Sequence, residues 1–176
     1  MDKKAFLSDR TASMYINLHE NAAGEDYAFI SKPVLINSVT ATLKEINAPR
    51  NVIRFNGWPT FLQRKVWEVA GEITEELSFL LTSINKEIIA VPDTPGFISP
   101  RIISMIINEA YYALEDEVSS RYDIDTAMKL GTNYPYGPFE WAEKIGLMPI
   151  AGLLQKLSGE DKRYLPASLL LKEALA

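Results

Sequence analysis

The sequence predicts an α/β unit followed by an all-α unit, and two observations support this division. Short apolar segments rich in β-branched or aromatic residues recur up to residue 91. After the segment VPDTPG at 91–96 these strand patterns stop, and apolar residues recur at helical spacing. The composition, 47% hydrophobic and 23% charged, is that of a globular protein. We therefore place a boundary within 91–95 and predict domains at 1–91 and 92–176.

The predicted strands of the first domain are all short and apolar. They are MYINL (14–18), PVLIN (33–37), NVIRF (51–55), VWEVA (66–70) and EIIAV (87–91). A helix is predicted at 39–46, and another at 72–84 with acidic residues in its first turn, where the helix dipole favours negative charge. Strands joined through helices predict a parallel or mixed sheet.

The second domain is predicted to begin with a helix that carries a wide apolar stripe. The stripe consists of Ile98, Ile102, Ile103, Ile106, Ile107, Ala110, Tyr111 and Leu114. Its width predicts burial, either within the chain or against a second subunit. A short helix is predicted at 124–130, with Asp123 as its N-cap and Gly131 just beyond its end. A Pro/Gly turn at 133–138 separates it from helices predicted at 139–157 and 166–175.

Charge and composition exclude several classes of function. The net charge of −5 argues against nucleic-acid binding, which needs a basic face. The absence of cysteine excludes disulfides, thiolate nucleophiles and cysteine metal sites. The N-terminal segment MDKKAFLSDR has no apolar run typical of a secretory signal, and no apolar stretch is long enough to span a bilayer. A cytoplasmic protein is therefore expected.

Three motifs occur in order in the second half of the chain. Pro-Gly-Phe stands at 95–97, Asn-Glu-Ala at 108–110, and Asp-x-Ala-Met-x-Leu-Gly at 125–131, the last followed by Pro135, Gly137 and Pro138. This string resembles the 3-hydroxyacyl-CoA dehydrogenase family. The resemblance implies a helical C-terminal-type domain that forms a homodimer and binds an acyl-CoA.

The first half resembles only part of that family's nucleotide-binding domain. The segment SMYINLHEN is similar to its fourth strand, PVLINSV to its Asn-Thr-Ser strand, and VIRFNGWP…VWEV to the segment that carries a catalytic His and Glu. A truncated Rossmann-like sheet is therefore implied. The family binds NAD through a G-x-G-x-x-G turn, and no three of the nine glycines here make that pattern. No cofactor is expected for the chain alone.

The resemblance assigns three relict catalytic positions. If Glu68 matches the family's glutamate, Asn56 stands at the position of its histidine base, and an amide does not titrate near pH 7. Ser38 matches the active-site serine, or Asn37 does if the alignment slips by one residue. Pro100 replaces a substrate-contacting asparagine. The sole histidine, His19, is expected in a surface loop.

Each candidate residue also has a purely structural interpretation. Asn56 and Glu68 form either a remnant acyl-CoA pocket or a satisfied polar pair at strand ends. Asn37, Ser38 and Thr40 are typical turn residues. Asp123 and Asp125 are more typical of helix caps than of metal ligands. The tryptophans are expected to anchor a core or an interface, and they are Trp58, Trp67 and Trp141.

Three hypotheses of function remain open at this point. The first is a non-catalytic homodimeric relative that binds acyl-CoA or serves as a scaffold. The second is a working NAD-dependent dehydrogenase whose nucleotide-binding half comes from another chain or segment, added at the sheet edge beside MYINL (14–18). The third is an interaction protein that has kept only the fold.

Overall fold

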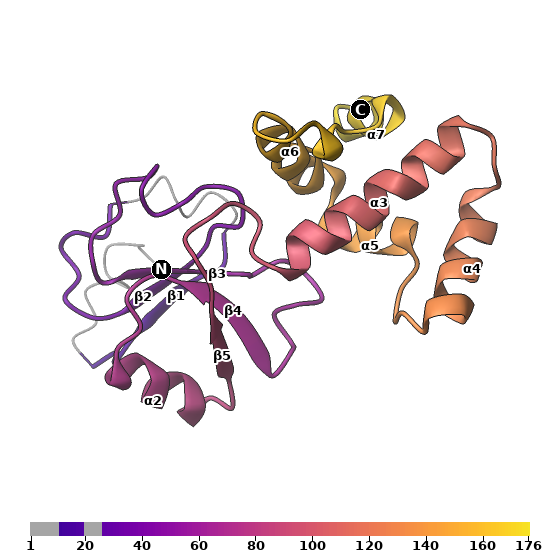
Figure 1. Ribbon diagram of the computed structural model, residues 1–176. Helices are drawn as coiled ribbons and strands as arrows, with labels where there is room; N and C mark the ends of the chain where they lie inside the picture. The colour runs from indigo at the N-terminus through magenta and orange to yellow at the C-terminus, as the bar shows by residue number, and fades with distance from the viewer. Residues whose placement is uncertain (1–10, 20–25) are drawn as a thin grey trace. The chain divides into compact units, whose positions relative to one another are not determined.

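The computed structural model describes residues 11–19 and 26–176, and the chain divides into two compact units (Figure 1). The first, here named the sheet unit, runs through Phe97, and the second, the helical unit, runs from Ile98 to Ala176. The sequence-based boundary at 91/92 lies slightly upstream of this division. Each unit is built around its own buried residues and is described by itself below.

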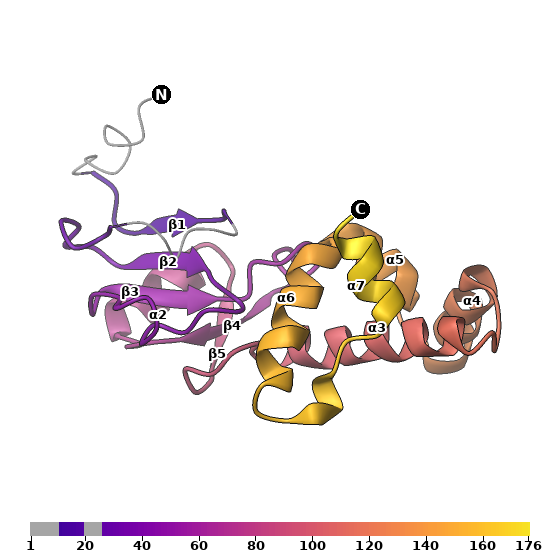
Figure 2. The same cartoon turned by 90° about the horizontal axis from the view of Figure 1, so that it is seen from above.

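The sheet unit contains a five-stranded mixed sheet. Its strands are β1 (Tyr15–Asn17), β2 (Val34–Asn37), β3 (Val52–Phe55), β4 (Val66–Ala70) and β5 (Glu87–Ala90). They lie side by side in chain order, as Figure 2 shows. All neighbouring pairs are parallel except β3 and β4, which are antiparallel. The five predicted strands and the mixed sheet are therefore confirmed.

Both faces of the sheet are covered, because successive side chains along a strand point to opposite faces. One face packs against α2 (Glu75–Ser83). The core layer between that face and the helix consists of Leu35, Ile53, Phe55, Trp67 and Val69 from the strands with Leu77 and Leu81 from α2. The other face packs against loop segments, and its buried residues are Tyr15, Tyr27, Ile30, Val34, Ile36 and Val52. The β-branched and aromatic residues that predicted the strands therefore fill two core layers.

Of the two helices predicted in this unit, only the second forms. α2 begins after its N-cap Thr74, whose side chain accepts a hydrogen bond from the Leu77 N–H. The predicted helix at 39–46 is wrong, because the segment makes turns with one α-type bond, from the Ile46 N–H to the Thr42 carbonyl at 3.2 Å. Asn47 then takes a left-handed conformation (φ 48°), and Pro49 follows, so a helix cannot propagate.

The helical unit contains α3 (Ser99–Glu115), α4 (Arg121–Thr132), α5 (Pro138–Ile145), α6 (Leu147–Ser158), the 3₁₀ turn η2 (Lys162–Tyr164) and α7 (Ser168–Ala174). The helix predicted at 139–157 is split at Gly146, whose φ of 94° ends α5 and opens α6. The predicted cap Asp123 is wrong, since Ser120 caps α4. Gly131 does not end the helix either, because the left-handed residue is Asn133 (φ 56°).

The apolar stripe of α3 is buried along only part of its length. Ile103, Ile107 and Tyr111 lie in the core, whereas Ile98 and Ile102 are 46% and 52% exposed. Within one chain the stripe is therefore not buried at the start of the helix, and its predicted burial against a second subunit stays a prediction. Among the helices that the structure describes, none is both long and apolar enough to span a bilayer.

Candidate functional site

The strand pair β3/β4 brings Asn56 and Glu68 together. Arg54 lies opposite Ala70 and Phe55 opposite Val69 in this antiparallel pair. Directly beyond it, the Asn56 N–H donates to the Glu68 carbonyl at 3.1 Å. Both residues are buried, with 3% and 9% exposure. Opposed residues of an antiparallel pair carry their side chains on the same face, about 5 Å apart at Cβ, so the amide and the carboxylate share one local environment.

The turn after β3 is closed by the side chain of Asn56 itself. Asn56 Oδ1 accepts a hydrogen bond from the Trp58 N–H at 3.3 Å, an Asx-type contact that turns the chain away from the strand. Trp58 is 2% exposed and therefore anchors this turn in the core. The amide oxygen of Asn56 thus has a local structural task, which is to shape the turn that carries Gly57.

Asn37, at the end of β2, links three neighbouring chain segments. Its Nδ2 donates to the Leu18 carbonyl at 3.2 Å, and its Oδ1 accepts from the Gly57 N–H at 3.2 Å. A Cβ added at Gly57 would lie only 2.7 Å from Asn37 Cγ, so only glycine allows this close approach. The ends of β1 and β2 and the turn after β3 are therefore held together by one amide.

Ser38 takes part in a different contact. Its hydroxyl donates to the Ala41 carbonyl at 2.8 Å and so closes its own turn. Asn37 and Ser38 are the two residues that could match the active-site serine of the family. The Asn37 side chain bonds to the turn at 56–57, whereas the Ser38 side chain bonds to the loop that follows β2. Both side chains are buried at the carboxyl ends of the strands, the edge where ligands of α/β sheets bind.

The other sequence candidates lie elsewhere. His19 is exposed, and its backbone N–H is bonded to the Asn17 side chain at 3.0 Å. Trp67 and Trp141 are buried, which is consistent with their expected role as core anchors. Pro100 is buried in the first turn of α3, where the missing N–H of proline costs no helical bond.

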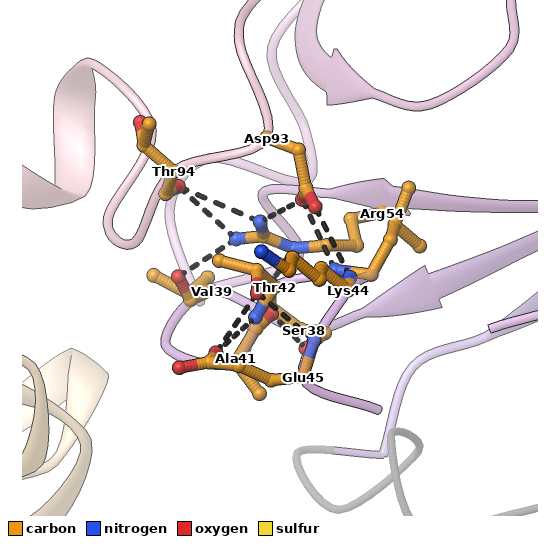
Figure 3. A network of polar contacts seen from close by, with 10 residues as sticks. Ser38, Val39, Ala41, Thr42, Lys44, Glu45, Arg54, Asp93 and Thr94 are labelled. Atoms are coloured by element: carbon orange, nitrogen blue, oxygen red, sulfur yellow. Dashed lines mark hydrogen bonds and ion pairs between the residues drawn. The ribbon is translucent and has the colours of Figure 1, made fainter. Parts of the chain in front are cut away.

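Sequence reasoning missed Arg54, a fully buried cation in β3. Its guanidinium contacts Asp93 Oδ1 at 2.5 Å and the carbonyls of Ser38 and Val39 at 2.8 and 3.1 Å (Figure 3). Burial lowers the pKa of Arg54, and the Asp93 carboxylate opposes that effect. The signal was present in the sequence, because a charged residue inside the apolar segment NVIRF must find buried partners.

The motif residues of the helical unit fasten its segments to one another. Asn108 is 2% exposed; it donates to the Leu165 carbonyl and accepts from the Ala167 N–H, both at 2.8 Å. Asp125 accepts from the N–H groups of Phe139 and Glu140 at 2.8 and 3.2 Å and so caps α5. These contacts explain two of the motif residues by structure alone, and capping is the role that was expected for Asp125.

A polar cluster joins α3, α4 and α7. Glu173 accepts hydrogen bonds from Tyr111 Oη at 2.8 Å and from Arg121 at 2.5 Å. Burial acts to raise the pKa of Glu173, but the bonds from Arg121 and Tyr111 outweigh it, so this pKa lies below its ordinary value. The cluster borders an open pocket of about 580 Å³ that Phe139 and Met148 also line.

The described residues do not fit a dinucleotide in the family's manner. Pyrophosphate binding needs a free helix N-terminus after a parallel strand. Between strands of the described part of the sheet unit, the one helix is α2, and its first turn carries Glu75 and Glu76. These carboxylates already occupy the positive end of the helix dipole and would repel a phosphate. Within 11–19 and 26–176, no group of three acidic, His or Cys side chains is arranged for a metal ion.

Comparison with known proteins agrees with this architecture. Residues 96–175 match the family model described as 3-hydroxyacyl-CoA dehydrogenase, C-terminal domain. The chain is 43% identical over 104 residues to 3-hydroxyadipyl-CoA dehydrogenase of Escherichia coli. The matched region covers 58% of this chain and 22% of that protein. The chain is also 34% identical over 143 residues to 3-hydroxybutyryl-CoA dehydrogenase of Clostridioides difficile. This match covers 77% of this chain and 51% of the relative.

Solved structures give the same result. The crystal structure of 3-hydroxybutyryl-CoA dehydrogenase from Escherichia coli superimposes with a TM-score of 0.70 at 34% identity and covers 83% of this chain and 32% of that one. Fold and matches together define a dehydrogenase architecture, with a Rossmann-like sheet followed by a helical domain. The chain belongs to the 3-hydroxyacyl-CoA dehydrogenase family, as the motifs predicted. It spans only 22% and 51% of the two relatives named above.

Proposed function

We propose that this chain is an acyl-CoA-binding relative of the 3-hydroxyacyl-CoA dehydrogenases that does not itself remove the substrate proton. One observation carries this proposal: the Asn56 N–H bonds to the Glu68 carbonyl at 3.1 Å, so an amide stands opposite the carboxylate. An amide can donate a hydrogen bond to a keto or thioester oxygen, but it cannot accept a proton near neutral pH. Loss of a general base costs about 10²- to 10⁴-fold in rate.

The ligand class follows from the relatives and from the strand-end residues. The named relatives are dehydrogenases of 3-hydroxyadipyl-CoA and 3-hydroxybutyryl-CoA. Buried amides such as Asn37 and Asn56 offer polar groups at the edge of the sheet where ligands of α/β proteins bind. Hydrogen bonds at such buried places are stronger than those in water.

A homodimer formed through the helical unit belongs to the same proposal. Exposed apolar side chains are frequent on this unit, and the most exposed ones are Val118, Tyr122, Leu130 and Leu175, all at least 70% exposed. In a homodimer such side chains would leave water at the subunit interface, which favours association. Sedimentation should therefore give a dimer, and Leu130→Glu should weaken it. A cytoplasmic location belongs to the same proposal.

Isothermal titration calorimetry with acetoacetyl-CoA and with NADH, run separately, tests the ligand. We expect binding of acetoacetyl-CoA and none of NADH, and Asn56→Ala should weaken the acyl-CoA titration. Replacement of exposed Glu109 by Ala is the matched control. Oxidation of 3-hydroxybutyryl-CoA, followed by NADH absorbance, should remain undetectable. Turnover by the purified chain, or the absence of any acyl-CoA heat, would overturn the proposal.

A second candidate is a dehydrogenase completed by a nucleotide-binding half from another chain or segment. The observation in its favour is that β1 stands at the end of the strand order, paired in the described region with β2 alone. An edge strand can accept a further strand. A pull-down that returns a stoichiometric nucleotide-binding subunit, together with NADH formation by the mixture, would favour this candidate over the first.

A further inference from the structure

Arg54 is a charged residue in the apolar core of the sheet unit, where its hydrogen-bond donors need buried partners. Its side chain is 0% exposed, on a strand whose neighbours Val52 and Phe55 are also buried. Burying an unpaired guanidinium costs several kcal/mol, so such a group remains only where its donors are satisfied. Alternation along β3 places Arg54 on the same face as Asn56, two residues further on.

The donors of Arg54 join two segments that are far apart in sequence. Nε donates to the Ser38 carbonyl at 2.8 Å and Nη2 to the Val39 carbonyl at 3.1 Å. On the other side, Nη1 pairs with Asp93 at 2.5 Å, and the Thr94 carbonyl lies 3.4 Å from Nη2. One guanidinium therefore connects the turn after β2 to the segment after β5, as Figure 3 shows.

The two segments are also tied to each other. Asp93 accepts from the N–H groups of Leu43 and Lys44 at 3.1 and 3.3 Å, and the Gly96 N–H donates to the Val39 carbonyl at 2.8 Å. The centroid of the Phe97 ring lies 4.7 Å from the guanidinium carbon of Arg54. Arg54 is thus the centre of a closed set of contacts that fixes the backbone from 38 to 44.

We propose that Arg54 is a positioning residue that presets the turn carrying Asn37 and Ser38 beside Asn56, and thereby sets the affinity for the acyl group of the proposed acyl-CoA ligand. Its planar fork serves acceptors in several directions at once, which a lysine ammonium cannot reproduce. Within this segment the Ser38 hydroxyl closes its own turn on the Ala41 carbonyl, and Arg54 and Asp93 join that turn to the rest of the sheet unit. A displacement of about 1 Å in such a site can cost about 100-fold.

The first arm of the test does not need a ligand. Hydrogen exchange of the full chain should show that Arg54→Met speeds exchange of the Leu43, Lys44 and Gly96 amides about tenfold or more, with smaller effects of Arg54→Lys and Asp93→Asn. The matched control is Arg50→Met, because Arg50 is exposed just before the same strand. Unchanged exchange at these three amides would overturn the positioning role.

The second arm measures affinity for acetoacetyl-CoA and for free CoA. Arg54→Met should weaken acetoacetyl-CoA about 10- to 100-fold and leave CoA unchanged, and added ethylguanidinium should restore part of the loss in Arg54→Ala. An equal loss for both ligands would show a merely structural role. If Arg54→Met fails to fold, Arg54→Lys and Asp93→Asn provide the test. The loss of affinity for acetoacetyl-CoA is then compared with the loss for CoA in these variants. A wild-type chain that binds no acetoacetyl-CoA refutes the proposed function, while the exchange arm still tests the role of Arg54 in holding the turn.

Discussion

A histidine placed at position 56 would report, through its pKa, the electrostatic environment between β3 and β4. In Asn56→His, the imidazole should stand opposite the Glu68 carboxylate and keep its proton more readily. Its pKa should therefore lie about one unit above the ordinary value of about 6.5. Proton NMR titration of the new imidazole measures this pKa.

The companion variant for this titration is Asn56→His combined with Glu68→Gln. Removing the carboxylate should lower the pKa of the new histidine, because burial then disfavours its charged form. The same pKa for the histidine at 56 in both variants would show that residues 56 and 68 do not interact through their side chains.

Asn108 allows a second prediction at the scale of one residue. Asn108→Ala removes the side-chain acceptor of the buried Ala167 N–H and one of two donors to the Leu165 carbonyl, which also accepts from Tyr112 Oη at 3.1 Å. One buried N–H left unsatisfied should lower the free energy of unfolding by about 1–3 kcal/mol. Urea unfolding followed by helical circular dichroism measures the loss. The neighbouring change Glu109→Ala, at an exposed position, should stay within about 0.5 kcal/mol.

Single residues were predictable from sequence only where the partner is close along the chain. The pairing of Asn56 with Glu68 follows from a turn between adjacent strands, and the structure has it. The network of Arg54 was not predictable, because its partners Ser38 and Asp93 come from segments on either side of β3. No local pattern reports a contact between segments so far apart.

Among the elements, the junction of α4 and α5 depends on a glycine. A Cβ at Gly137 would lie 2.3 Å from the Asp125 carboxylate carbon, which caps α5. Gly137→Ala should therefore displace the cap and lower stability by about 2 kcal/mol or more. Gly131, inside α4, has nothing within 4 Å of its added Cβ.

Gly131→Ala is accordingly the matched control for Gly137→Ala. An alanine in a helix interior is favoured over glycine, so this variant should be stabilised by up to about 1 kcal/mol. Thermal unfolding of both variants gives the comparison. Similar midpoints for the two would mean that the contact between Gly137 and Asp125 contributes nothing.

The docking of α7 should depend on acid pH through Glu173. The folded-state pKa of Glu173 is lowered, so its contribution to stability is present above the unfolded pKa of about 4.3 and is lost as pH falls through the folded value. Urea midpoints at neutral and acid pH should therefore differ less for Glu173→Gln than for the wild type.

The size of this pH effect is limited by solvent. The Arg121 side chain is 42% exposed and that of Glu173 33%, so water and salt screen the pair. Glu160→Gln, at an exposed position, is the control and should leave the acid sensitivity unchanged. An unaltered pH dependence in Glu173→Gln would contradict the assignment.

Elements were predicted well where their pattern is long or strongly apolar, as for the five strands and α3. Helix ends were predicted less well, because Ser120 and Asp123 are both good capping residues and only backbone geometry selects Ser120. The segment 39–46 was mistaken for a helix, since the bonds from its backbone N–H groups to the distant Asp93 carboxylate cannot be seen in its own sequence.

At the scale of the whole molecule, each unit carries its own core. Leu81 in the sheet unit and Leu154 in the helical unit are both fully buried. Leu81→Ala and Leu154→Ala should each cost about 2–5 kcal/mol. Hydrogen exchange should show the loss in strands β2 to β4 for the first variant and in α3 and α6 for the second. Identical exchange maps for the two variants would contradict separate cores.

The family could be recognised from ordered motifs, and the comparisons confirm it. The structure adds a physical reason for several motif residues: Asn108, Asp125 and Gly137 hold helices and loops in contact. The ligand and the oligomeric state were not decided by the same motifs, because residues that maintain a fold are compatible with many functions.

The bond between Gly57 and Asn37 has a consequence for the covalent lifetime of the chain. Asn-Gly is the dipeptide that loses ammonia most readily, because the glycine nitrogen can attack the preceding side-chain amide and close a succinimide ring. Here that nitrogen donates its hydrogen to Asn37 Oδ1 at 3.2 Å, and the backbone of Asn56 is fixed to Glu68. Deamidation at Asn56 should therefore be slow in the folded protein and fast once it unfolds, which makes this position a chemical record of past unfolding.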